Sequence, residues 1–180
     1  ACAWLGGCAS LRPAAVDAAP PPPPPPVDVL VDAPDALRRL LDTHLDLTRL
    51  VRVAGSEPIS ESELRRLENA TPAQARALLA TEGYMDAQVS TRREGDAAAA
   101  DGRPRVRVIV EPGVRTQVSA VALAVGGPLG DEAASGDPAA QALVEQWKRA
   151  WTLPPGQAFS NAAWRDAKNN ALARLRGAGY

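Results

Sequence analysis

The sequences ALLATEGY at residues 77–84 and ARLRGAGY at residues 173–180 decide the fold of this chain. Each is a helical stretch with a leucine four residues before the glycine of a Gly-Tyr pair. Glycine accepts the left-handed backbone that ends a helix, and the tyrosine ring can lie across the helix end where the next strand begins. The two stretches therefore predict two tandem copies of one small domain.

Signals upstream of the first Gly-Tyr pair predict one strand followed by helices. Val27 to Val31 alternates and is β-branched, which is typical of a strand. Residues typical of helix starts follow, including a capping box and a Thr-Pro pair. The expected helices are an amphipathic one from Pro34 with Leu37, Leu40, Leu41, His44 and Leu45 on one face, a short one capped at Ser60, and one from Thr71 to Gly83.

Beyond Gly83 the hydrophobic period changes to two, which predicts a hairpin. Its second strand is expected at 105–111, with Val106, Val108 and Val110 facing inward, after a loop over 94–102. The order strand, helical pair, strand, strand predicts an α+β unit, a three-stranded mixed sheet covered by two helices. The first strand of the hairpin should place four residues on one side, namely Met85, Ala87, Val89 and Thr91.

Pro112-Gly113 then punctuates the chain, and the same order begins again. We expect a first domain over 27–113 and an incomplete second domain over 114–180. The second should hold a strand over 118–125, a polar loop to Gly136, a helix capped at Asp137 and a helix capped at Ser160. Because no strand pair follows Tyr180, the strand over 118–125 should lack a partner, and the Trp147 and Trp164 face should be partly uncovered.

Residues 1–26 differ in composition and predict a signal-peptide remnant followed by a tether. Leu5-Gly6-Gly7-Cys8 resembles a lipobox, which makes Cys8 a candidate for lipidation. The run Pro20 to Pro26 favours a semi-rigid polyproline II spacer; the alternative is an SH3-type ligand motif. Both cysteines lie in this segment, so neither a disulfide framework nor a cysteine metal site is expected in the rest.

Composition and charge narrow the function classes. The 180 residues carry 20 Lys and Arg against 21 Asp and Glu, so no whole-chain field attracts nucleic acid. A local basic face of Arg103, Arg105 and Arg107 would remain, but no aromatic platform accompanies it. The single histidine, His44, excludes a two-histidine metal site, and we expect it to be a partly buried structural residue.

An exported hydrolase is a second alternative, but the sequence contains no nucleophile elbow, HExxH or paired-carboxylate motif. We therefore expect no enzymatic activity, no cofactor, no metal and no nucleic-acid partner.

The order of elements, with Gly83-Tyr84 at the helix exit and Pro112-Gly113 after the last strand, resembles the POTRA domains of outer-membrane assembly and secretion proteins. The stretch EPGVRTQV at 111–118 resembles a junction between two such domains, and LPPGQAF at 153–159 with 164–180 resembles their helical half. The stretch LLDTHLDL at 40–47 is similar to the TamA branch of that family, the outer-membrane subunit of the translocation and assembly module. The resemblance covers residues 27–180.

The resemblance implies a docking module in the periplasm that engages unfolded outer-membrane protein substrates. It also implies a TamB-like partner anchored in the inner membrane and an outer-membrane β-barrel that is not part of this chain. In the family the second strand of each unit is the edge strand, which maps onto Met85 to Arg92 and makes Met85, Ala87, Val89 and Thr91 candidates for strand addition. The alternative is a solvated edge blunted by Arg92 and Arg93. Three alternatives remain for the protein that contains this region: a two-partner secretion transporter, a general barrel-assembly protein, or an exported lipoprotein binding module.

Overall fold

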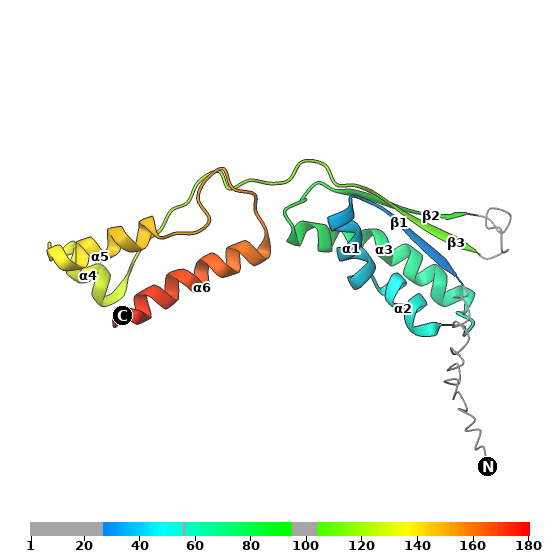
Figure 1. Ribbon diagram of the computed structural model, residues 1–180, viewed down its shortest axis with the longest axis horizontal. Helices are drawn as coiled ribbons and strands as arrows, with labels where there is room; N and C mark the ends of the chain where they lie inside the picture. Colours follow the sequence, from blue (N-terminus) through cyan, green and yellow to red (C-terminus); the bar gives the residue numbers. More distant parts are fainter. Residues whose placement is uncertain (1–26, 56, 95–103) are drawn as a thin grey trace, which may run out of the picture.

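The computed structural model describes residues 27–55, 57–94 and 104–180, and its sheet has three strands (Figure 1). They are β1 (Asp28–Asp32), β2 (Gln88–Glu94) and β3 (Arg105–Glu111), in the order β1-β3-β2. β1 runs parallel to β3, and β2 runs antiparallel to it. The mixed three-stranded sheet expected in the first unit is therefore confirmed. Cys8, the proline tether, most of the expected loop over 94–102 and Arg103 lie outside the described residues.

Three helices, and not the expected helical pair, cover one face of this sheet (Figure 1). The helix expected from Pro34 ends at His44 and a separate helix follows it, whereas the helices expected at Ser60 and at Thr71 are one helix. They are α1 (Asp35–His44), α2 (Asp46–Ala54) and α3 (Glu61–Thr81). α1 and α2 are separated by Leu45 alone, whose backbone is extended at φ −67° and ψ 134°. This break lets both Leu45 and Leu47 reach full burial, at 0% exposure. A continuous helix could not turn both side chains toward the same core, because residues two apart do not face each other on a helix.

The expected helix start at Thr71 is wrong, because α3 runs without interruption through Pro72. Proline has no N–H, so the carbonyl of Glu68, four residues earlier, loses its helical donor. The hydroxyl of Thr91 on β2 donates a hydrogen bond to that carbonyl at 3.2 Å. Thr71 caps nothing and instead donates to the Leu67 carbonyl at 2.7 Å from a fully buried position. The proline is thus accommodated by a contact from the sheet.

We expect Thr91→Val to destabilise the protein by about 1–2 kcal/mol, because the Glu68 carbonyl would lose its partner. The same replacement in a Pro72→Ala background should cost less, since an alanine at that position restores the helical N–H. Chemical denaturation of the four variants in this cycle measures the difference. An equal cost in both backgrounds would contradict this account of how α3 passes through the proline.

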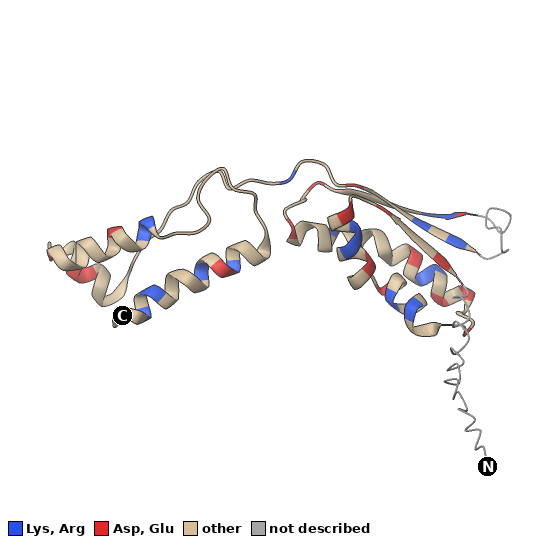
Figure 2. Ribbon diagram, viewed as in Figure 1, with Lys and Arg blue, Asp and Glu red and all other residues tan. Residues whose placement is uncertain are grey.

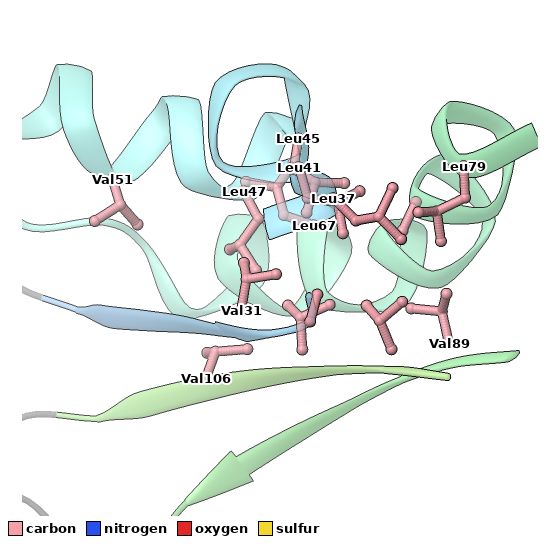
Figure 3. Packing of buried hydrophobic residues seen from close by; sticks show 14 of the residues in the cluster. Val31, Leu37, Leu41, Leu45, Leu47, Val51, Leu67, Leu79, Val89 and Val106 are labelled. Carbon is pink, nitrogen blue, oxygen red and sulfur yellow. The ribbon is translucent and has the colours of Figure 1, made fainter. Parts of the chain in front are cut away.

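One hydrophobic core joins the sheet to α1, α2 and α3 (Figure 3). The inner valines of β3 lie beneath leucines contributed by all three helices. Val106 and Val108 are fully buried and Val110 is nearly so, as the alternation of β3 predicts. The fully buried leucines of this core are Leu41, Leu45, Leu47 and Leu79.

Residues 114–180, all of them described, form three helices and no strand. They are α4 (Gly127–Ala134), α5 (Pro138–Arg149) and α6 (Asn161–Gly177). The Asp137 and Ser160 caps are confirmed, because each side chain accepts backbone N–H groups of its helix. The expected polar loop before Gly136 is wrong, since it contains α4, with Pro128 in the first turn and Leu129 buried.

The expected strand over 118–125 is also wrong, because the segment has no ladder partner among the described residues. Among the described residues, pairing is limited to its start, where Gln117 forms an isolated bridge with Ala158 and Val118 is hydrogen-bonded to the backbone of Gly156 and Gln157. A strand is defined by hydrogen bonds to a neighbour, so a β-prone sequence without one stays outside any sheet. The sheet predicted for the second unit is therefore not observed. Among the helices of the described ranges, none is long and apolar enough to cross a membrane.

Candidate functional site

β2 lies at the edge of the sheet, with β3 on one side and no described strand on the other. Of the four candidate residues, Val89 and Thr91 belong to β2, whereas Met85 and Ala87 precede it. The chain turns at Met85 and Asp86 after the left-handed Gly83, so pairing begins only at Gln88. Ala87 and Val89 are buried under the helices, and Met85 is exposed. The edge that a partner strand could pair with is therefore Gln88–Glu94.

Two side chains fix the outer half of β2 to α3. Arg93 forms a bidentate pair with Glu68, with both N···O distances 2.9 Å, and also donates to Glu61 at 2.7 Å. Thr91 donates to the backbone of the same Glu68. Arg93 is therefore directed toward α3. The alternative interpretation, in which Arg92 and Arg93 extend into solvent and protect the edge from strand addition, does not hold for Arg93. The edge strand is held in place by its inner face, while its backbone borders solvent.

Acidification should weaken this attachment. The hydrogen bond from Arg93, the largest cause, lowers the pKa of Glu61 below its ordinary value. A carboxylate whose pKa is lower in the folded state stabilises the fold above its unfolded pKa, and that contribution is lost as pH falls through the folded value. We therefore expect the stability lost below about pH 4.3 to be smaller in Arg93→Gln than in the parent. Arg49→Gln, at an exposed residue of α2, is the control, and equal acid sensitivity in both variants would contradict this role.

Charged residues gather near the hairpin end of β2 and β3 (Figure 2), and on the uncovered face of the sheet they form two ion pairs. Arg105 contacts Asp28 at 2.7 Å, and Arg107 contacts Glu94 at 2.6 Å. The hydrogen bond to Glu94 raises the pKa of Arg107, and that from Arg107 lowers the pKa of Glu94. The two described arginines of the basic face considered for nucleic-acid binding, Arg105 and Arg107, are therefore already matched by carboxylates. A phosphate backbone would have to displace them.

A shallow cavity of about 180 Å³ lies on this face where β2 begins. It is lined by Gln88, Val89 and Ser90 of β2 and by Ile109 and Glu111 of β3. The lining combines one acidic and two neutral polar side chains with apolar ones. The cavity borders the free edge and can accept a side chain of a strand added there.

Both Gly-Tyr pairs end their helices with the same Schellman geometry. Tyr84 N–H donates to Leu79 O at 3.1 Å, and Tyr180 N–H donates to Leu175 O at 3.0 Å. Gly83 and Gly179 have almost identical positive φ values of 92° and 91°. The sequence repeat is therefore also a repeat of backbone structure at the two helix ends.

The first Gly-Tyr corner also contacts the second half of the chain, which the sequence did not predict. Gly83 O accepts a hydrogen bond from Thr116 N–H at 2.8 Å, and a Cβ at Gly83 would lie 2.4 Å from Phe159 O. Arg115 donates to the carbonyl of Glu82 at 2.8 Å and lies over the Tyr84 ring, 5.9 Å from its centroid. The left-handed Gly113, at φ 69°, follows Pro112 just before these contacts.

The second corner makes fewer contacts. No heavy atom would lie within 4 Å of a Cβ at Gly179. Tyr180 is partly exposed, and its hydroxyl donates to Glu132 of α4 at 2.7 Å, which raises the pKa of that tyrosine. Trp164 is also exposed, at 43%, although it packs edge-on against Trp151 with ring centroids 5.8 Å apart.

Groups suited to bond chemistry do not gather at either corner or at the β2 edge. His44 is exposed, and not partly buried as expected, because it is the last residue of α1 and the helix is interrupted at Leu45. Among the described residues, no group of three or more His, Cys, Asp and Glu side chains could hold a metal ion.

Comparison with solved structures gives a match of low similarity. No protein-family model and no curated protein matches the sequence. The chain is similar to the crystal structure of BamA POTRA3-5 from Haemophilus influenzae, with 14% sequence identity and a TM-score of 0.30. The match covers 86% of this chain and 49% of that chain, so this chain spans about half its length.

Proposed function

We propose that this chain is a docking module that binds extended polypeptide segments at the β2 edge, without enzymatic chemistry. The observation that carries the proposal is the pairing of β2. It has one strand neighbour, its inner side chains are anchored on α3, and its outer backbone is open to a further strand. Main-chain hydrogen bonding to such an edge tolerates many sequences, which suits a binder of unfolded chains.

The proposed setting is the periplasmic part of an outer-membrane assembly protein. The strand order β1-β3-β2 and the paired Gly-Tyr corners fit the POTRA resemblance found in the sequence. The proposed ligands are unfolded outer-membrane proteins, and the parent protein would carry a β-barrel beyond this chain.

Within that family we propose the TamA branch and a TamB-like inner-membrane partner. The stretch at 40–47 supports this choice, and it forms the α1–α2 junction of the core.

Site-specific photo-crosslinking tests the docking edge. A photoreactive residue at Ser90, which is exposed on β2, should form an adduct with an unfolded outer-membrane barrel polypeptide. The same residue at Arg49, exposed on α2, is the matched control and should give several-fold less adduct. Equal labelling at the two positions would reject the β2 edge as the docking site.

A further inference from the structure

The β2 edge carries opposite charges at its two ends. At the start of β2, Glu111 lies directly opposite Gln88 in the register, and Asp86 precedes the strand. Both carboxylates are exposed. Toward the hairpin end, Arg92 is exposed on the same face as Gln88, because the two positions are four residues apart on one strand. A strand added to β2 would therefore lie beside acidic groups at one end and beside a basic group at the other.

The carboxylate of Glu94 does not cancel the charge of Arg92. Arg107 donates a hydrogen bond to Glu94 at 2.6 Å, and this bond is the largest cause of the lowered pKa of that carboxyl. Arg105, which is opposite Glu94 in the register, forms a separate pair with Asp28 at 2.7 Å. At this end of the uncovered face, the described residues thus comprise three arginines and two carboxylates.

Arg92 also has an unfavourable neighbour on β3. Arg107 lies directly opposite it in the register. Like charges directly opposite each other destabilise an antiparallel pair, whereas opposite charges stabilise it. A carboxylate on a strand added at the free edge, opposite Arg92, would give this arginine the oppositely charged neighbour that β3 does not provide.

The cavity of about 180 Å³ at the start of β2 suits a basic side chain. Its lining includes Ile109, which is half-buried opposite Ser90, and the exposed Glu111. Lysine and arginine pack an aliphatic stem on apolar surface while the charged end remains in water. A basic residue opposite Gln88 on an added strand could therefore place its stem on Ile109 and its charge beside the carboxylate of Glu111.

The direction of the added strand decides which charge comes first along it. Antiparallel pairs are more stable per residue than parallel ones and are more common. A segment antiparallel to β2 begins at the hairpin end, beside Arg92, and reaches Gln88 four residues later. Its residues opposite Thr91 and Val89 point to the side of the sheet that the helices cover, where Val89 is buried, so these should be apolar.

We propose that the β2 edge selects extended segments by the order of their charges. The preferred segment runs antiparallel to β2, with an acidic residue opposite Arg92 and a basic residue opposite Gln88, four positions later. Apolar residues occupy the positions opposite Thr91 and Val89. This inference rests on the proposed docking function and deepens it, because it states which unfolded segments bind there most tightly.

Two peptides of identical composition test the charge order on the full chain. The Glu-first peptide is Thr-Val-Glu-Val-Ser-Val-Lys-Val-Thr, and the Lys-first peptide exchanges its Glu and Lys. Both have blocked termini, so that no end charge contributes. Calorimetry should show about fivefold tighter binding of the Glu-first peptide at low salt, since two exposed pairs change from like to opposite charge. The ratio should approach one at about 1 M salt.

Variants assign the preference to the β2 edge. Arg92→Gln should lower the affinity ratio to about twofold, because one of the two pairs is lost. Arg92→Glu combined with Glu111→Lys should invert it, so that the Lys-first peptide binds more tightly. Arg49→Gln on α2 is the control and should leave the ratio unchanged. All of these residues are exposed, so circular dichroism should show an unchanged fold.

The outcomes separate this inference from the docking function on which it rests. Equal binding of the two peptides, or tighter binding of the Lys-first peptide to the parent chain, would overturn the charge order and leave the β2 edge as a docking site. A ratio that is the same in Arg92→Gln and in the charge-exchanged variant as in the parent would also overturn it. Binding of neither peptide would overturn it as well, and crosslinking at Ser90 to an unfolded barrel polypeptide then decides separately whether the docking function stands.

Discussion

Gly83→Ala is expected to destabilise the protein by about 2–5 kcal/mol and to release the second half of the chain from the end of α3. Two costs combine at this position. An L-residue at φ 92° is strained, and the new Cβ would lie 2.4 Å from the backbone oxygen of Phe159. A backbone atom cannot move aside as a flexible side chain can. Either Phe159 moves, with loss of the corner contacts, or α3 ends differently.

Gly179→Ala is the matched control for this prediction. It has the same backbone, φ 91°, but no atom within 4 Å of the new Cβ. We expect it to cost about 1–2 kcal/mol, the conformational part alone. Thermal or chemical denaturation measures both variants, and hydrogen exchange at Thr116, which donates to Gly83 O, reports the corner contact. Equal costs, with Thr116 protection unchanged, would show that the Phe159 contact contributes nothing.

Leu79→Ala should cost about 2–5 kcal/mol, the range for a fully buried leucine whose site cannot collapse. Leu79 has 0% exposure in the core of the sheet and its three helices. Its equivalent in the repeat, Leu175, is half-buried and borders open grooves on α6. Leu175→Ala should therefore cost about 1 kcal/mol or less, although the two leucines have the same position relative to Gly-Tyr. Denaturation of both variants tests this asymmetry, and equal costs would mean that α6 is covered in solution.

Local signals predicted the parts of the fold that depend on neighbouring residues. β3 was expected at its observed bounds, β1 within one residue, and the Asp137 and Ser160 caps at the observed residues. These features depend on alternation or on a side chain next to its own helix, so a short window contains their cause. The Gly-Tyr corners belong to the same class, because the glycine and its hydrogen-bond partners lie within one turn.

Features that depend on distant residues were predicted wrongly or were missed. Thr71-Pro72 has the form of a helix start, but Thr91 on β2 supplies the donor that lets α3 continue. Residues 118–125 have the composition of a strand, but no described strand lies beside them to form the ladder. The contact between Gly83 and Phe159 joins residues far apart in sequence, and no local pattern encodes it.

For the candidate site, too, local sequence predicted some features and missed those that depend on distant residues. Its position on the strand after Gly83 was predicted, but its start at Gln88 was not, because the turn at Met85 and Asp86 follows from how the chain leaves the α3 corner. The attachment of Arg93 to Glu68 and Glu61 was also missed, since the two partners lie on another element. Hydrophobic alternation predicts which side of β2 faces the helices, but it does not predict which groups of α3 form hydrogen bonds with the side chains of β2.

The parallel pairing of β1 with β3 has a mechanical consequence. The chain enters the sheet at Asp28, the start of β1, and leaves it at Glu111, the end of the neighbouring β3. In a parallel pair these two points lie at opposite ends of the ladder, so tension between them loads all β1–β3 hydrogen bonds together in shear. An antiparallel arrangement of the same two strands would place both points at one end, where the bonds would open one after another. We therefore expect the first unit to resist a pull between these two points better than an antiparallel arrangement of the same strands would.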